Sequence, residues 1–158
     1  MILSDEDYRK FLSAMPIVCV DCLVVNDKGE YLLVKRKNQP LKGEYWVPGG
    51  RLHKNERLVD AVHRKMREEI GVDVEIVENL GFFEEFFEET EQDAEGGVHS
   101  LSVVYLVTLC SYNIKLDDQS TGWGWFKDLP FRFKEYSYLK NTIEHLSGNH
   151  ADIVADSE

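Results

Sequence analysis

A run of charged residues at helical spacing follows directly after the turn Pro48-Gly49-Gly50. Within this run, Glu68 and Glu69 are adjacent carboxylates. Together with a free carbonyl of the glycine turn, they supply hard oxygen ligands, which suit Mg²⁺ or Mn²⁺ with water and a substrate phosphate completing the shell. The sequence therefore predicts chemistry that depends on a divalent cation.

These carboxylates need a helix to present them. Asn55 can cap a helix over residues 56–70, and Gly71 can end it in the left-handed conformation. At about 100° per residue, the apolar positions of this helix form one stripe. The stripe consists of Leu58, Val59, Val62, Met66 and Ile70. Arg64 and Glu68 lie opposite it, so the helix is expected to bury one face and expose its charges on the other.

Glu69 is the exception, because it falls on the flank of the apolar stripe. An unpaired carboxylate there is costly to desolvate. Either Lys65, four residues earlier, pairs with it, or a bound cation does. The neighbouring turn and the second carboxylate, Glu68, favour the cation. Lys65 is then expected to form only an exposed helix pair, whose loss changes stability by less than about 1 kcal/mol.

The whole run resembles the Nudix box, whose pattern is Gly, five residues, Glu, seven residues, Arg-Glu, an aliphatic residue, any residue, Glu-Glu, any residue, Gly and an aliphatic residue. Every fixed position from Gly50 to Val72 matches except one, where Lys65 replaces a Glu. The resemblance implies a Nudix-type α/β/α sandwich with a mixed β-sheet, in a single domain over residues 1–158. The missing Glu is the usual proton acceptor in several Nudix enzymes, so its replacement bears directly on mechanism.

The resemblance also implies roles for individual residues. The metal would be held by Gly50, Glu68 and Glu69, while Glu56 and Arg64 would form a supporting ion pair. Mg²⁺ or Mn²⁺ is the implied cofactor, and a homodimer is the implied assembly.

Residues outside the box are similar to those of the GDP-mannose mannosyl hydrolases, which are Nudix enzymes with a similarly degenerate box. The matches include Asp21 on the first long strand, Arg36 on the second, and Arg51 after the glycine turn. The resemblance implies that Arg36 and Arg51 neutralise the diphosphate leaving group and that Asp21 contacts the sugar. Arginine suits this role, because its planar fork holds two phosphate oxygens at once. Together with Glu69, these three residues are the expected catalytic set.

The later part of the chain departs from those enzymes. When the chain is aligned on Trp125, their metal-binding Gln falls at Gln119, but their catalytic His falls at Ser120. The identity of the general base is therefore open. The candidates that could replace the His are Asp117, Asp118, Glu88, Glu89, Glu91 and His99.

The remaining segments form the framework. The expected strands cover residues 17–26, 30–37, 73–87, 100–110 and 123–126. The expected flanking helices cover residues 5–14 and 134–146. Residues 88–97 are acidic and contain glycine, which is typical of either a mobile lid or a plain solvated turn. Residues 149–158 are expected to be a frayed tail.

Composition limits the class of partner. The chain has 158 residues, of which 43% are apolar, enough for a single core. A net charge of −11 argues against extended nucleic-acid contact, which needs many Lys and Arg residues. No apolar run approaches the roughly 20 residues of a membrane helix, and the acidic N-terminus is unlike a signal peptide. We therefore expect a cytoplasmic protein without membrane contact, with Cys19 and Cys22 buried in its core.

The expected function is metal-dependent hydrolysis of a small nucleoside-diphosphate sugar, with GDP-mannose as the first substrate to test. Cleavage of a P–O–P bond in another nucleotide is the alternative. Lys65 weakens that alternative, because a lysine cannot be the usual carboxylate base, but a loop acid could restore it. The third interpretation is a catalytically weak domain that binds a nucleotide sugar, and the intact pair Glu68 and Glu69 argues against it.

Overall fold

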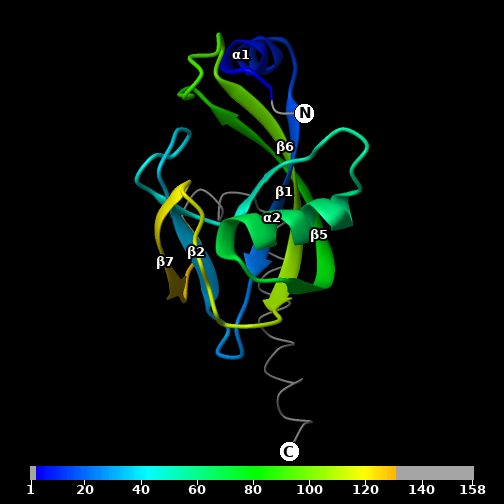
Figure 1. The fold of residues 1–158 in the computed structure, drawn as a ribbon, viewed down its shortest axis with the longest axis vertical. Helices are drawn as coiled ribbons and strands as arrows, with labels where there is room; N and C mark the ends of the chain where they lie inside the picture. The colour runs from blue at the N-terminus through cyan, green and yellow to red at the C-terminus, as the bar shows by residue number, and fades with distance from the viewer. Residues whose placement is uncertain (1–2, 131–158) are drawn as a thin grey trace, which may run out of the picture.

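The computed structural model describes residues 3–130, so the expected helix over 134–146 and the expected tail over 149–158 lie outside the described range. Within that range, each of the two helices is followed by a run of strands along the chain (Figure 1). They are α1 (Asp5–Ala14), β1 (Ile17–Val24), β2 (Tyr31–Arg36), β3 (Tyr45–Trp46), β4 (Gly49–Arg51), α2 (Leu58–Ile70), β5 (Val74–Phe87), β6 (Val98–Leu109) and β7 (Ser120–Phe126). The expected strands are all present, although β7 begins earlier than expected, at Ser120.

The strands form two sheets. The larger sheet has the order β4-β1-β6-β5, in which β1 runs parallel to β6 and both outer pairs are antiparallel. The smaller sheet has the order β3-β2-β7 and is antiparallel throughout. The expected mixed β-sheet is therefore confirmed. The parallel register of β1 and β6 sets Cys19 opposite Ser102 and Ile17 opposite Ser100. Side chains from two strands that are far apart in the sequence therefore share one face of the sheet.

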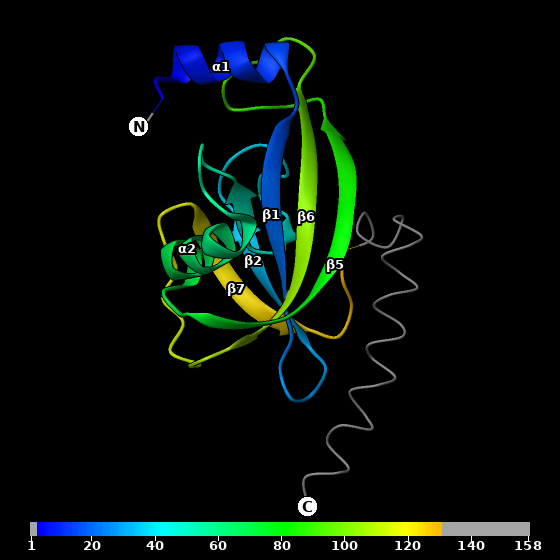
Figure 2. The same ribbon diagram turned by 90° about the vertical axis from the view of Figure 1, so that its right-hand side faces the viewer.

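Apolar side chains cover both faces of the larger sheet. α2 packs against one face, as Figure 2 shows. This cluster includes Val20, Val24, Val34, Val62, Met66, Ile70 and Val107. The smaller sheet contributes to a second cluster, which includes Leu23, Leu33, Trp46, Val104 and Leu106. Burial of each side chain of this size stabilises the fold by about 1.5–3 kcal/mol. α2 is therefore held firmly against the larger sheet, close to the Pro48-Gly49-Gly50 turn.

α1 lies across one end of the larger sheet, beyond the ends of β1 and β6 (Figure 2). The helix begins after Ser4, whose hydroxyl oxygen accepts a hydrogen bond from the Asp7 N–H, as in an N-cap. On its inner side, Leu12 packs with Ala94 and Val98. The loop over 88–97 therefore packs against α1, which a plain solvated turn does not do.

The start of α2 differs from the sequence prediction. Asn55 is not the N-cap, because the helix begins two residues later than expected and Arg57 takes the cap position without a side-chain hydrogen bond. Asn55 instead adopts a positive φ of 65° in the preceding loop. Val59 is exposed rather than part of the buried stripe. The predicted end of the helix is confirmed, since Gly71 takes the left-handed conformation with φ of 67°.

In the described part of the chain, no helix has the length and apolar character needed to cross a membrane. The expected homodimer and the expected cytoplasmic location stay predictions.

Candidate active site

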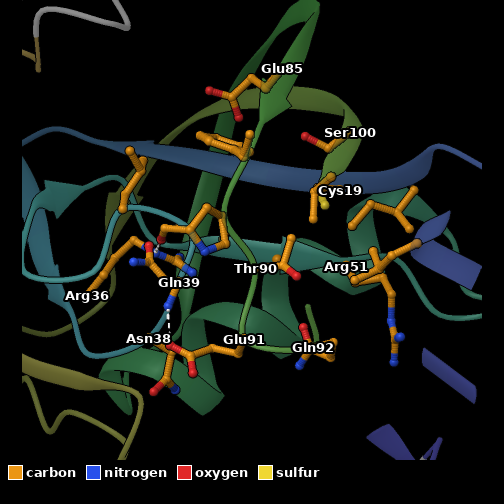
Figure 3. A pocket seen from close by; sticks show the side chains of 18 of the residues that line it. Cys19, Arg36, Asn38, Gln39, Arg51, Glu85, Thr90, Glu91, Gln92 and Ser100 are labelled. Carbon is orange, nitrogen blue, oxygen red and sulfur yellow. Dashed lines mark hydrogen bonds between the residues drawn. The ribbon is translucent and has the colours of Figure 1, made fainter. Parts of the chain in front are cut away.

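A cavity of about 690 Å³ opens where α1, the larger sheet and two loops meet. This volume is in the range of sites that hold a nucleotide-sized ligand. Residues from segments far apart in the sequence line it, as Figure 3 shows for part of the set. Six of the predicted site residues are among them, namely Asp21, Arg36, Gly50, Arg51, Glu91 and Gln119.

Asp21 lies buried at the floor of this cavity, opposite Gly49 in the pairing of β1 with β4. A Cβ at Gly49 would collide with the Asp21 carboxylate, so glycine is needed for this close approach. Burial raises the pKa of Asp21 to about 7, against the opposing effect of a side-chain hydrogen bond with Ser102. The cavity therefore holds a carboxyl group that titrates near neutral pH.

Two arginines flank the cavity, and Figure 3 shows Arg36 and Arg51 on opposite sides of it. The Arg36 Nε donates to the Pro40 carbonyl oxygen at 2.6 Å, which fixes the guanidinium at the end of β2. The Arg51 guanidinium lies over the Tyr8 ring, 4.6 Å from its centroid, in a cation–π contact. Burial raises the pKa of Tyr8, although Arg51 opposes this effect. Guanidinium groups placed in this way can contact a diphosphate from two sides.

The acidic loop over residues 88–97 contacts Gln39 on one side of the cavity. The Gln39 N–H donates to Glu91 Oε1 at 2.6 Å, and its side-chain amide donates to Glu89 Oε2 at 2.8 Å. Among the candidate bases, Glu91 lines the cavity. His99 is outside the cavity lining and instead stacks on Phe86, with 4.4 Å between ring centroids.

Gln119 lines the cavity just before β7. Its side-chain amide donates to Asp118 Oδ1 at 3.0 Å, and its Oε1 accepts a hydrogen bond from Asn38. The backbone N–H of Gln119 donates to Asp117 Oδ1 at 3.0 Å. Asp117 and Asp118 therefore support Gln119 and do not themselves line the cavity.

Arg64 connects α2 to the glycine turn. Its guanidinium forms a two-pronged ion pair with Glu56, in which Nη2 lies 2.8 Å from Oε2. Nη2 also donates to the Arg51 carbonyl oxygen at 3.0 Å, and Nη1 donates to Glu68 at 3.1 Å. The hydrogen bond with Arg64 lowers the pKa of Glu56 to about 2. This arrangement fixes the helix against the strand that carries Arg51.

Lys65 lies where the sequence favoured a bound cation. Its Nζ is 2.9 Å from Glu69 Oε1 and 3.5 Å from Glu68 Oε2. The other oxygen of Glu69 accepts a hydrogen bond from the Gly49 N–H at 3.2 Å. The Lys65 and Glu69 side chains are only 17% and 12% exposed, so the expectation of an exposed helix pair is wrong. Burial alone lowers the pKa of Lys65, but the two carboxylates outweigh it and raise the pKa, so this group stays protonated.

A divalent cation fits the donors around this ammonium. The carboxylates of Glu68 and Glu69 converge on a position that already holds a positive charge, and Gly50 lies directly against the Lys65 side chain. In residues 3–130, no three His, Cys, Asp or Glu side chains form a ready metal cluster. Any cation bound here therefore takes its remaining ligands from backbone, amide, water or substrate oxygens.

Sequence reasoning missed several residues of this cavity. Tyr8, Glu85 and Ser102 line it, and Cys19 does so as well, contrary to the expectation of a core position. Burial raises the pKa of Cys19 to about 12, which favours the neutral thiol over the thiolate. The signal available in the sequence was the alternation along β1 and β6, but only their parallel register shows that the Cys19 and Ser102 side chains share a face.

Comparison with known proteins agrees with this geometry. A profile of the NUDIX domain matches residues 15–137. Low-salt glycan biosynthesis protein Agl8 of Haloferax volcanii is 39% identical over 117 residues, or 74% of this chain and 74% of that protein. ADP-ribose pyrophosphatase of Methanocaldococcus jannaschii is 29% identical over 157 residues, or 98% of this chain and 81% of that protein.

Solved structures share the fold. The MutT NUDIX hydrolase of Burkholderia pseudomallei is 28% identical and superposes with a TM-score of 0.65, over 80% of this chain and 97% of that one. The overall fold of this chain is thus similar to that of a solved NUDIX hydrolase. The chain therefore belongs to the Nudix hydrolase family.

Proposed function

We propose that this protein hydrolyses a nucleoside-diphosphate sugar at the bond between the sugar carbon and the diphosphate, with Mg²⁺ or Mn²⁺ as cofactor. The observation that carries this proposal is the state of Lys65. It stands where many family members have a proton-accepting Glu, and its ammonium is held 2.9 Å from Glu69 Oε1. A protonated lysine cannot accept a proton from water. Attack at phosphorus therefore lacks its usual base at this position.

The charges around the cavity suit a diphosphate leaving group. A nucleoside diphosphate can depart from a sugar carbon only if the charge that develops on it is stabilised. Arg36 and Arg51 would contact this group from opposite sides of the cavity, each held in place by a neighbouring residue. The buried carboxyl of Asp21 would meet the sugar hydroxyls between them.

The metal would be held by Gly50, Glu68 and Glu69, with Gln119 as a further oxygen donor. A bound divalent cation supplies positive charge to the departing diphosphate. For the base that activates water, we favour Glu91, because it is the candidate whose side chain belongs to the cavity lining. Its carboxylate is oriented by the Gln39 N–H.

The named relatives support two versions of this activity. One relative carries a name from glycan biosynthesis, a process in which nucleotide sugars are the common donors. Another is named an ADP-ribose pyrophosphatase, and this name favours the second candidate function, cleavage of a P–O–P bond. A nucleoside diphosphate joined to a sugar is common to both versions, so the bond that breaks is the point to test.

Product analysis tests the proposal. Purified protein with Mg²⁺ or Mn²⁺ would be incubated with GDP-mannose and, separately, with ADP-ribose, and the nucleotides would be separated by chromatography. We expect GDP and free mannose from the first substrate. GMP with mannose 1-phosphate, or AMP with ribose 5-phosphate as the dominant reaction, would instead support P–O–P cleavage. Absence of turnover across a wider panel of nucleotide sugars, with binding retained, would support the binding-domain interpretation.

A further inference from the structure

The ammonium of Lys65 and the expected metal share the same carboxylate ligands. Lys65 Nζ lies 2.9 Å from Glu69 Oε1 and 3.5 Å from Glu68 Oε2. A divalent cation bound to Glu69 lies about 2.0–2.6 Å from its ligand oxygens. An ammonium and a metal ion cannot both occupy that space, because two positive charges would then be in direct contact.

The glycine turn gives the lysine its place. A Cβ built on Gly50 would lie 2.7 Å from Lys65 Cε and 3.2 Å from Lys65 Nζ, so the lysine side chain passes directly over this residue. Any residue with a side chain here would displace the lysine. The ammonium is thereby enclosed by the turn on one side and by the two carboxylates of α2 on the other.

The charges nearby explain why a cation is needed there. Glu69 is largely buried, and the carboxylates of Asp21 and Asp117 interact electrostatically with it. A buried carboxylate with other carboxylates near it and no counter-charge is strongly unfavourable. Arg64 is engaged with Glu56 and with the Arg51 carbonyl oxygen, and of the two adjacent glutamates it bonds with Glu68. Among residues 3–130, Lys65 is therefore the cation that balances Glu69 when no metal is bound.

We propose that Lys65 is a tethered cation that competes with the divalent metal for Glu69 and Glu68, so that metal can bind only after the lysine side chain has moved away. This inference rests on the metal role of these carboxylates given under Proposed function. A competing internal cation lowers the apparent metal affinity, because the metal can bind only to the fraction of molecules in which the lysine has moved away. It also keeps the metal-free protein folded, because the buried acid never lacks a partner.

Binding of Mn²⁺ without substrate tests the competition. Free Mn²⁺ would be followed by electron paramagnetic resonance during titration of wild type, Lys65→Gln and Lys10→Gln. Lys10 is the matched control, since it forms a Lys–Glu pair of the same spacing on the exposed face of α1. We expect Lys65→Gln to bind Mn²⁺ at least about tenfold more tightly than wild type, and Lys10→Gln to match wild type. Equal or weaker binding by Lys65→Gln would overturn the proposal.

A measurement on the wild-type protein keeps the test decisive if Lys65→Gln does not fold. An amine-acylating reagent would be applied with and without Mg²⁺, and labelling of each lysine would be quantified by peptide mass spectrometry. Competition predicts that Mg²⁺ speeds the labelling of Lys65 while that of Lys10 stays constant. Unchanged or slower labelling of Lys65 would contradict it.

The two proposals can fail separately. Tighter Mn²⁺ binding by Lys65→Gln without any turnover of nucleotide sugars would support the tethered cation and refute the proposed substrate. Turnover of a nucleotide sugar by wild type, with unchanged Mn²⁺ affinity in Lys65→Gln, would do the reverse.

Discussion

Two Lys–Glu pairs in this protein have the same sequence spacing and nearly the same length, yet they lie in very different surroundings. Lys10 Nζ is 2.8 Å from Glu6 Oε1, and Lys65 Nζ is 2.9 Å from Glu69 Oε1. The side chains of the first pair are 62% and 69% exposed, while those of the second are 17% and 12% exposed. Spacing alone therefore does not determine what such a pair contributes.

The difference lies in what each glutamate meets when its lysine is removed. Glu6 is left in water, which solvates it, so exposed pairs of this kind are worth only about 0.3–0.5 kcal/mol. Glu69 is left buried without a counter-charge, and a buried charge that lacks one is costly. A buried Lys–Glu pair beside a cavity is thus a better candidate for a functional role than an exposed pair.

The largest expected effect comes from the acid of the buried pair. Glu69→Gln removes a charge that we propose holds the metal, and it should lower the rate of hydrolysis by at least about 10²-fold. Glu75→Gln, which neutralises an exposed carboxylate on β5, is the control and should keep the wild-type rate. Steady-state rates with Mg²⁺ check this. Near-normal turnover by Glu69→Gln in the presence of a chelator would show that neither the Glu69 carboxylate nor a metal is needed for hydrolysis.

Removal of either cavity arginine should have the next largest effect. Arg36→Ala and Arg51→Ala should each cost roughly 1 to 3 kcal/mol in transition-state binding, as expected for charged hydrogen bonds to phosphate. Lys28→Ala, in the exposed turn before β2, changes net charge equally and should have no effect. The ratio kcat/KM for each variant is the measurement. Unchanged kcat/KM in both arginine variants would show that the cavity does not bind the diphosphate.

The two lysines can be compared directly by stability. Without metal, Lys65→Gln should lower the free energy of unfolding by about 1–3 kcal/mol, because Glu69 loses a charged hydrogen bond in a buried site. Lys10→Gln should lower it by less than about 0.5 kcal/mol. Urea denaturation with a chelator present measures both. Equal losses in the two variants would mean that burial does not separate the pairs.

The smallest effect concerns acid stability and the ion pair that supports α2. The pKa of Glu56 is lowered from 4.5 to about 2 in the folded state. Its pair with Arg64 therefore stabilises the fold fully above about pH 4.5, and this contribution disappears as the pH falls toward 2. Glu56→Gln should be less stable than wild type at neutral pH and should lose less stability across this window. Parallel pH profiles from thermal unfolding would contradict the assignment.

Local rules were sufficient for much of the fold. Gly71 ends α2 because its left-handed conformation suits glycine, and this could be read from the sequence. Strand alternation likewise located the long strands. The start of α2 could not be read in the same way, because Glu56 bonds with Arg64 and with the His53 N–H instead of joining the helix.

The site was harder to predict wherever distant segments meet. The box spacing indicated Glu69 as a site residue, but the burial of Lys65 depends on how the glycine turn packs over α2. Tyr8 could be assigned to Arg51 only once α1 was placed across the end of the sheet. Ser102 required the parallel register of β1 and β6. These relations arise from tertiary packing, which no local pattern encodes.

The most direct test of the proposed activity is hydrolysis of the nucleotide sugar in ¹⁸O-labelled water, with the products analysed by mass spectrometry. If water attacks the sugar carbon, the label should appear on the released sugar and the diphosphate should carry none, because it leaves as a group stabilised by metal and arginines. Configuration at that carbon should also invert, as in a single displacement by one activated water. Label in a phosphate product would instead mean attack at phosphorus, and it would contradict the assignment of this protein as a nucleotide-sugar hydrolase that cleaves the C–O bond.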